Sequence, residues 1–105
     1  NFFVGDALLQ TEQVQEAVPY LEMALKLNPK LLPAHASLGL CYGRLGEMPK
    51  AIPHLKAALT LDNDGRLHYQ LARAYQATGQ PVLAKAMMDK YQQLHKSAAA
   101  TDPAQ

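Results

Sequence analysis

Apolar residues recur every three or four positions along most of the chain, which is the spacing of one face of an α-helix. Leu38, Tyr42 and Leu45 form one such stripe, and Gly46 follows where the end of a helix needs a left-handed residue. A second stripe begins soon after, at Ile52, Leu55, Ala58, Leu59 and Leu61. The pattern therefore predicts an all-α protein with six helices, near 1–10, 13–27, 31–45, 48–61, 65–78 and 81–97.

The sequence also repeats itself with a period of 33 to 34 residues. A shift of 34 places Gly5 on Gly39, and a shift of 33 places Tyr42 on Tyr75. The same shifts align Ala17 with Ala51 and Ala84, Leu21 with Leu55, Ala24 with Ala58, Leu38 with Leu71, and Gly46 with Gly79. A small residue where two helices cross lets them approach closely. Because one helix pair cannot bury its apolar face alone, stacked pairs are predicted.

Composition narrows the class of protein further. A chain of 105 residues with 49% hydrophobic residues suits one folded domain. A net charge of +1 gives no reason to expect binding to nucleic acid or to an anionic membrane, and no apolar run is long enough to insert into a bilayer. Cys41 is a single cysteine, so no intramolecular disulfide can form. The sequence names no compartment; the cytoplasm is the default, and a targeting signal could have preceded Asn1.

The stretch HASLGLCYGRLGE, residues 35 to 47, places His35, Ser37, Cys41 and Tyr42 close together. These side chains could act as base, nucleophile and acid, or they could be packing residues of one helix. The repeat favours packing, because Ser37 aligns with glutamine and Cys41 with alanine in the next copy. No motif for a cofactor or for catalysis is present, and we expect no enzyme activity.

Two histidines, His35 and His68, occupy the same position in their repeats. We interpret both as half-buried packing residues, and the alternative is a metal ion bridging them on adjacent helices. His54 and His95 fall on the second helices, where nothing in the sequence brings them near that pair. No metal-ligand spacing supports a metal site.

The repeated positions follow a pattern of Leu-Gly-x-x-Tyr, then Gly, Ala, a large apolar residue, Ala and Asn-Pro. The second copy reads Leu38, Gly39, Tyr42, Gly46, Ala51, Leu55 and Ala58, and the first copy ends in Asn28 and Pro29. This pattern resembles the tetratricopeptide repeat family. The resemblance implies an α-solenoid of three antiparallel helix pairs forming a right-handed superhelical array. Its repeats would span about 1–31, 32–64 and 65–96, with a frayed or disordered tail at 97–105.

The chain departs from the family pattern at a few positions. Glu12 stands where Gly46 and Gly79 stand in the later copies, and Asn63 replaces the closing proline. His35 and His68 replace an aromatic residue. We expect local loosening at these places and no change of fold.

The resemblance implies a non-catalytic protein-protein interaction module. In this family the first helix of each pair lines a concave groove that binds peptides or partner helices. The residues expected at groove positions are Phe2, Asp6, Leu9, Ser37, Leu40, Arg44, Arg66, Tyr69, Gln70, Arg73 and Gln76. Arg44, Arg66 and Arg73 suit carboxylates, so a mild preference for acidic segments is expected. Some relatives bind a C-terminal carboxylate through a clamp of basic and amide residues, but Phe2 and Asp6 depart from that clamp.

The two ends of the array differ in their apolar character. Val18 and Leu25 align with Ile52 and Leu59, and all four are expected to face the following repeat. Lys85 and Gln92 hold these places in the third copy, so we expect the array to end there. Phe2 and Phe3 open the first helix, which favours more protein upstream of Asn1 or packing on the first helix pair.

The alternatives to a peptide-binding module are a structural or self-associating segment, and a helical appendage of a larger enzyme.

Overall fold

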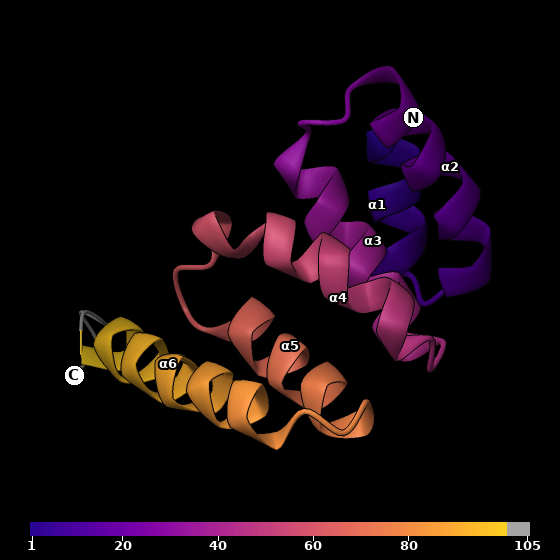
Figure 1. Ribbon diagram of the computed structural model, residues 1–105. Helices are drawn as coiled ribbons and strands as arrows, with labels where there is room; N and C mark the ends of the chain where they lie inside the picture. Colours follow the sequence, from indigo (N-terminus) through magenta and orange to yellow (C-terminus); the bar gives the residue numbers. More distant parts are fainter. Residues whose placement is uncertain (101–105) are drawn as a thin grey trace.

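The computed structural model describes residues 1–100, and they form an all-α array (Figure 1). Its helices are α1 (Phe2–Gln10), α2 (Val14–Leu27), α3 (Leu32–Arg44), α4 (Met48–Ala57), the 3-10 helix η1 (Leu59–Leu61), α5 (Arg66–Ala77) and α6 (Pro81–Ala100). The described residues thus confirm the all-α fold of three antiparallel helix pairs. Residues 101–105 belong to the predicted tail and lie outside the described residues.

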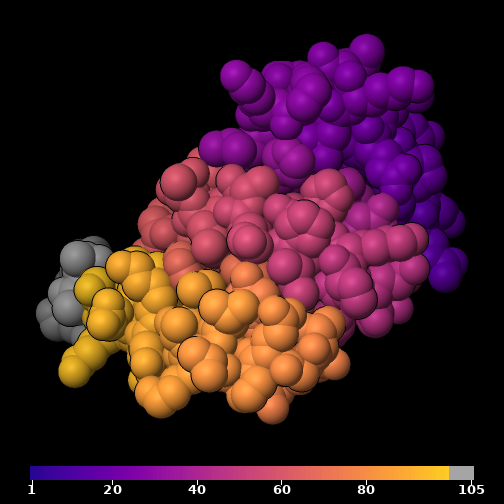
Figure 2. Space-filling view, in the orientation of Figure 1, coloured from indigo at the N-terminus to yellow at the C-terminus, as the bar shows by residue number. Residues whose placement is uncertain are grey.

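Each helix packs mainly against its neighbours in sequence. The pairs are α1 with α2, α3 with α4, and α5 with α6, and the pairs join where α2 meets α3 and α4 meets α5. The first helices also contact one another, α1 with α3 and α3 with α5. Figure 2 shows the result as three consecutive bands across the surface, from indigo at the first pair to yellow at the last. This order places the first helices of all three pairs on one side.

The core runs through all three pairs and is built from the repeated apolar positions. The largest fully buried side chains are Leu21, Leu38, Leu55, Leu71 and Cys41. Ala17 and Ala51 are completely buried at the crossing points. Burial of this repeated set removes apolar surface from water, which is the main favourable contribution to folding.

Glycine allows close approach of the two helices in the first two pairs. A Cβ atom at Gly39 would lie 2.8 Å from Cγ of Leu55 and 3.1 Å from its backbone nitrogen. At Gly5 it would lie 2.7 Å from Cγ of Leu21. The packing role expected for these small residues is therefore confirmed.

We expect Gly39→Ala to lower the free energy of unfolding by about 2 kcal/mol, because overpacking exceeds the gain in helix propensity. Gly43 lies in the same helix, and a Cβ atom there would have nothing within 4 Å. Gly43→Ala should therefore raise stability by about 0.5–1 kcal/mol. Urea unfolding followed by circular dichroism measures both. Equal effects of the two substitutions would contradict the close crossing at Gly39.

The turns inside the helix pairs share one backbone conformation. Gly46 and Gly79 have φ angles of 78° and 74°, and Glu12 has a φ angle of 64° at the aligned position. A non-glycine residue in this left-handed region costs roughly 1–2 kcal/mol. Glu12 thus keeps the geometry of the family turn, and the loosening expected there is not seen in the backbone.

The fourth helix is shorter than predicted. The sequence pattern predicted one helix over 48–61, but α4 ends at Ala57 and η1 follows at Leu59–Leu61. The tighter 3-10 turn leads to Asp62, whose carboxylate accepts the backbone N–H of His68 at 3.0 Å in the first turn of α5. Asp64 accepts the backbone N–H of Arg66 at 3.0 Å. Both aspartates therefore cap α5 and lie at its positive dipole end.

The last helix is longer than predicted. The tail was expected to begin at residue 97, but α6 continues to Ala100. Lys85 and Gln92 are exposed on it, whereas Val18, Leu25, Ile52 and Leu59 are partly buried against the core. No helix among the described residues combines the length and the hydropathy that a membrane crossing requires.

Candidate functional site

A hollow of about 570 Å³ lies among α1, α3, α5 and the turn that leads into α5; we call it the groove. It is lined by Phe2, Asp6, Leu9, Gln10, Glu12, Pro33, Ala36, Ser37, Leu40, Arg44, Leu61, Asp62, Asn63, Asp64, Arg66 and Leu67. Leucine side chains supply apolar surface, and carboxylates and guanidiniums supply charge. Sites that bind peptides or small ligands commonly combine these two kinds of surface.

The predicted groove residues divide into two groups. Seven of them line the groove: Phe2, Asp6, Leu9, Ser37, Leu40, Arg44 and Arg66. Arg73 and Gln76 line another hollow, between α5 and α6, together with Pro81 and Met88. The ring of Tyr69 lies 5.1 Å from that of Tyr91 in α6, and Gln70 is half-buried. Arg66 and Arg73 share a helix face, but seven residues separate them by roughly 10 Å along the axis.

The sequence analysis did not predict that the segment before α5 lines the groove. Leu61, Asp62, Asn63 and Asp64 line the groove, although the expected lining came only from first helices. The run Asp-Asn-Asp-Gly at 62–65 is typical of a turn that caps a helix, and it could have indicated carboxylates at this place. Glu12 was also missed, because its position was interpreted only as a turn.

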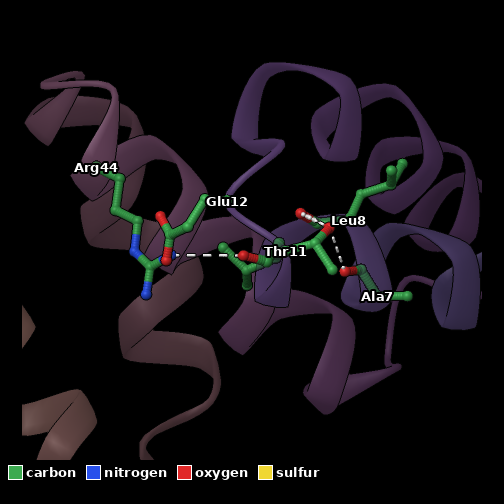
Figure 3. A network of polar contacts seen from close by, with 6 residues as sticks. Ala7, Leu8, Thr11, Glu12 and Arg44 are labelled. Atoms are coloured by element: carbon green, nitrogen blue, oxygen red, sulfur yellow. Dashed lines mark hydrogen bonds and ion pairs between the residues drawn. The ribbon is translucent and has the colours of Figure 1, made fainter.

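The arginines of the groove already have carboxylate partners. Arg44 lies 2.9 Å from Glu12 (Figure 3). It also donates a longer hydrogen bond of 3.5 Å to the carbonyl of Leu9. Arg66 lies 3.9 Å from Asp64. Since these pairs are partly exposed, each contributes little to stability, but each lowers the charge offered to a ligand.

Figure 3 also shows how the turn that carries Glu12 is held. The hydroxyl of Thr11 donates to the carbonyl of Ala7 at 3.0 Å and to that of Leu8 at 3.2 Å. These bonds satisfy carbonyl groups at the end of α1. The turn therefore presents Glu12 toward Arg44 of the next repeat.

A hydrogen bond crosses the groove between the first two repeats. The hydroxyl of Ser37 donates to Asp6 at 2.9 Å. Ser37 is buried, so this bond satisfies a hydroxyl that would otherwise lack a partner. Asp6 thereby links α1 to α3 within the lining of the groove.

A buried contact between His68 and Asp62 holds the turn before α5. Nδ1 of His68 lies 2.6 Å from Asp62, and both side chains are less than a tenth exposed. Burial alone would raise the pKa of Asp62, but hydrogen bonds from the His68 ring and from the backbone N–H groups of His68 and Leu67 hold it below its usual value. Asp62 is therefore a structural carboxylate in the lining of the groove.

The repeated spacing of these elements matches that of a known protein family. The tetratricopeptide repeat model matches residues 1–31 and 32–64, more than half of the chain. The chain belongs to the tetratricopeptide repeat family. The third helix pair lies outside the matched residues, although it packs as the first two do.

Comparisons with individual proteins agree with the assignment of this chain to the tetratricopeptide repeat (TPR) family. The chain is 38% identical over 62 residues to anaphase-promoting complex subunit 3 of Dictyostelium discoideum, which covers 59% of this chain and 6% of that protein. Among solved structures, MamA of AMB-1 gives a TM-score of 0.78 at 28% identity, covering 91% of this chain and 57% of MamA. A thermophilic TPR protein from Thermus thermophilus gives a TM-score of 0.62 at 32% identity, covering 88% and 45%. The chain thus spans about half the length of these solved relatives.

The histidine side chains of the TPR chain form contacts that the sequence analysis did not predict. His54 was not expected near His35, but their Nδ1 atoms lie 3.0 Å apart. Nε2 of His35 lies 2.9 Å from the carbonyl of Pro29, so it must donate, and Nδ1 of neutral His35 then accepts from His54. Burial and the neighbouring His35 lower the pKa of His54, and Glu22 opposes them. His68 is bonded to Asp62 instead, so these contacts give no support to a metal ion between His35 and His68.

Cys41 and Tyr42 of the HASLGLCYGRLGE stretch are packing residues of the TPR fold. Cys41 is completely buried, and burial raises the pKa of its thiol to about 11, which disfavours the nucleophilic thiolate. Burial, followed by a 2.6 Å hydrogen bond to Glu22, raises the pKa of Tyr42 to about 12. TPR domains are typically non-catalytic, and these two side chains are buried and neutral at pH 7.

Proposed function

We propose that this chain is a protein-interaction module that binds an extended peptide or a partner helix in the groove. The observation that carries the proposal is the position of the groove, which takes side chains from α1, α3 and α5 in turn. A ligand there would contact all three repeats, so its length would match the array.

The apolar part of the groove would supply most of the binding free energy. Leu9 and Leu67 are buried beneath it, and Leu40 is half-buried. Leu61 is 45% exposed at its rim, so a ligand side chain placed there would bury new apolar surface. Burial of such surface contributes roughly 25 cal/mol per Å².

The charges that line the groove lead us to replace the expected preference for acidic ligands. The acidic preference rested on Arg44, Arg66 and Arg73. An acidic ligand would have to compete with Glu12 and Asp64 for the first two guanidiniums, and Arg73 lines a different hollow. Because carboxylates outnumber guanidiniums among the lining residues, we propose a ligand that combines apolar with basic side chains.

Selection from a displayed peptide library tests the proposal. Peptides enriched on the wild-type chain should bind about tenfold more weakly to Leu61→Ser, because the rim loses apolar surface. Val82→Ser is the matched control, since Val82 is 80% exposed and does not line the groove. Equal binding to both variants, or no enrichment at all, would count against the groove as the site.

A second pair of substitutions tests whether the groove prefers basic or acidic ligands. Asp6→Asn keeps an acceptor for Ser37 and removes one charge, and Asp64→Asn removes a second. Together they should weaken a basic peptide about tenfold, since each exposed charge pair contributes roughly 0.2–1 kcal/mol. Enrichment of aspartate and glutamate in the selected peptides would instead restore the acidic preference predicted from the arginines.

A further inference from the structure

Two imidazole rings meet between the first turn of α3 and the second half of α4. Nδ1 of His35 lies 3.0 Å from Nδ1 of His54, and the ring centroids are 5.2 Å apart. Both side chains are half-buried, and neither lines the groove. The peptide-binding role proposed above therefore leaves this contact without a function.

Hydrogen atoms can be placed on this pair in only one way while both rings are neutral. Nε2 of His35 lies 2.9 Å from the carbonyl oxygen of Pro29, which can only accept, so Nε2 carries the hydrogen. Nδ1 of His35 then holds a lone pair and accepts from the Nδ1–H of His54. The neutral pair thereby connects α4, through His35, to the turn between α2 and α3.

The pair can take up one proton without losing this hydrogen bond. Nε2 of His54 carries no hydrogen in the neutral pair, and a proton added there leaves the Nδ1–H of His54 in place as the donor. A second proton has to bind Nδ1 of His35, so that both Nδ1 atoms carry hydrogens. Two like charges at this distance repel, and the rings must separate. Protonation of the two rings is therefore coupled and occurs in two steps.

The charges around the pair favour the first proton and not the second. Among the described residues, the charges that act on His54 are those of its partner histidine and of Glu22 in α2. Glu22 also accepts the hydroxyl of Tyr42 at 2.6 Å, and the Tyr42 ring stacks on His54 with centroids 5.8 Å apart. Lys50 of α4 lies 5.7 Å from the centre of the Tyr42 ring and pairs with Glu47. Because Glu47 is paired with Lys50, one carboxylate, Glu22, remains to balance charge on two histidines.

We propose that the His35–His54 contact is an acid-sensitive switch, which holds the turn between α2 and α3 while one ring can accept and releases it when both rings are protonated. Pro33 and Ala36, on either side of His35, line the groove. The segment that loosens therefore contributes to the lining of the groove. Acid would open part of a peptide site there, and this consequence, unlike the switch itself, rests on the proposed function.

The direction of the pH effect follows from the number of protons bound in each state. In the opened segment both histidines accept protons near the ordinary pKa of 6.5. In the closed pair, burial and then the neighbouring His35 lower the pKa of His54 below that value. The open state thus binds more protons in acid, so the closed contact is fully present above pH 6.5 and is lost progressively below it. One excluded proton makes opening about tenfold easier at about pH 5.5.

Hydrogen–deuterium exchange of residues 28–37 tests the switch on the complete chain, without any peptide. The backbone N–H groups of Leu31, Ala34 and His35 donate to carbonyl groups of the turn, so their protection reports its opening. The comparison is made between about pH 7.5 and about pH 5.5, after correction for the pH dependence of intrinsic exchange. We expect protection to fall about tenfold in acid.

His54→Gln keeps the contact and removes its acid sensitivity. The amide can donate to Nδ1 of neutral His35, or turn its oxygen to accept from protonated His35. Protection in this variant should change less than about twofold between the two pH values. His95→Gln is the matched control, since His95 is exposed on α6 and stacks on Tyr91. It should keep the tenfold loss of about the wild-type size.

NMR titration of the histidine ring signals adds a measurement on the wild-type chain that needs no variant to fold. The signals of His35 and His54 should move in two linked steps, and two independent single steps would overturn the proposal. Equal protection of the wild-type segment at both pH values would overturn it as well, and so would an acid loss that persists in His54→Gln. Since none of these measurements involves a peptide, the switch and the binding of peptides in the groove can fail separately.

Discussion

Gly65→Ala should lower the free energy of unfolding by about 3 kcal/mol, through backbone strain and overpacking together. Gly65 has a φ angle of 91°, which an alanine adopts only with strain. A Cβ atom there would also lie 2.8 Å from the carbonyl oxygen of Tyr91 and 3.1 Å from its Cα atom. These are backbone atoms in the middle of α6, so they cannot rotate away as a side chain would. The loss is large for a domain whose total stability is roughly 5–15 kcal/mol.

Gly79→Ala separates the two contributions. Gly79 has a φ angle of 74°, but a Cβ atom there would meet nothing within 4 Å. Only the conformational strain remains, and we expect a loss of about 1 kcal/mol. Denaturant unfolding of both variants, followed by far-UV circular dichroism, gives the difference directly. Similar losses for the two would mean that the turn does not touch α6 closely.

Asp62→Ala should also cost about 3 kcal/mol, because it leaves one member of a buried pair without its partner. The substitution removes the 2.6 Å contact to the ring of His68 and the 3.0 Å bond from its backbone N–H. This one substitution therefore removes a helix cap and leaves the buried imidazole without its hydrogen-bond partner. Thermal and urea unfolding should both show the loss.

Asp64→Ala provides the comparison for Asp62→Ala. Asp64 caps the same helix through the N–H of Arg66, but its side chain is 45% exposed and pairs only with the exposed Arg66. Its removal should cost about 1 kcal/mol, the usual value of a cap. If Asp64→Ala were as damaging as Asp62→Ala, the buried pair would not be the source of the larger effect.

The pH dependence follows from the depressed pKa of Asp62. Its unfolded-state pKa is close to the ordinary value of 3.8, and its folded-state pKa is lower. The ionised carboxylate therefore stabilises the fold above about pH 4, and this contribution is lost as the pH falls through the folded-state pKa. The stability difference between wild type and Asp62→Ala should shrink over that acidic range.

Much of the fold could be predicted because the information is local and repeated. Gly46 and Gly79 end their helices in the left-handed conformation that their residue type favours. Glu12 shows the limit of that reasoning, since glutamate does not favour a φ angle of 64°. The packing of the whole first pair imposes the turn, and only the alignment with the later repeats indicated it. The break after Ala57 was missed because the apolar period continues through it.

The candidate site was predictable in outline and not in its electrostatics. The family resemblance predicted eleven groove residues, and seven of them line one hollow in the structure. It could not show that Arg44 reaches Glu12, because these residues are 32 positions apart. Nor could it show that His54 pairs with His35, which depends on how α3 and α4 cross. Such contacts require distances of a few ångströms between separate helices, and a one-dimensional pattern carries no distances.

The sequence by itself determined the repeating unit, because 3.6-residue periodicity, turn residues and small residues at the crossings all act within one helix pair. It also determined the polar outer face at Lys85 and Gln92. Only the tertiary structure decided which charges are available in the groove and how the face of α5 is divided between two hollows. The reason is physical: neutralisation of a charge and closure of a hollow depend on the angle between successive pairs, which the packing of the whole array sets.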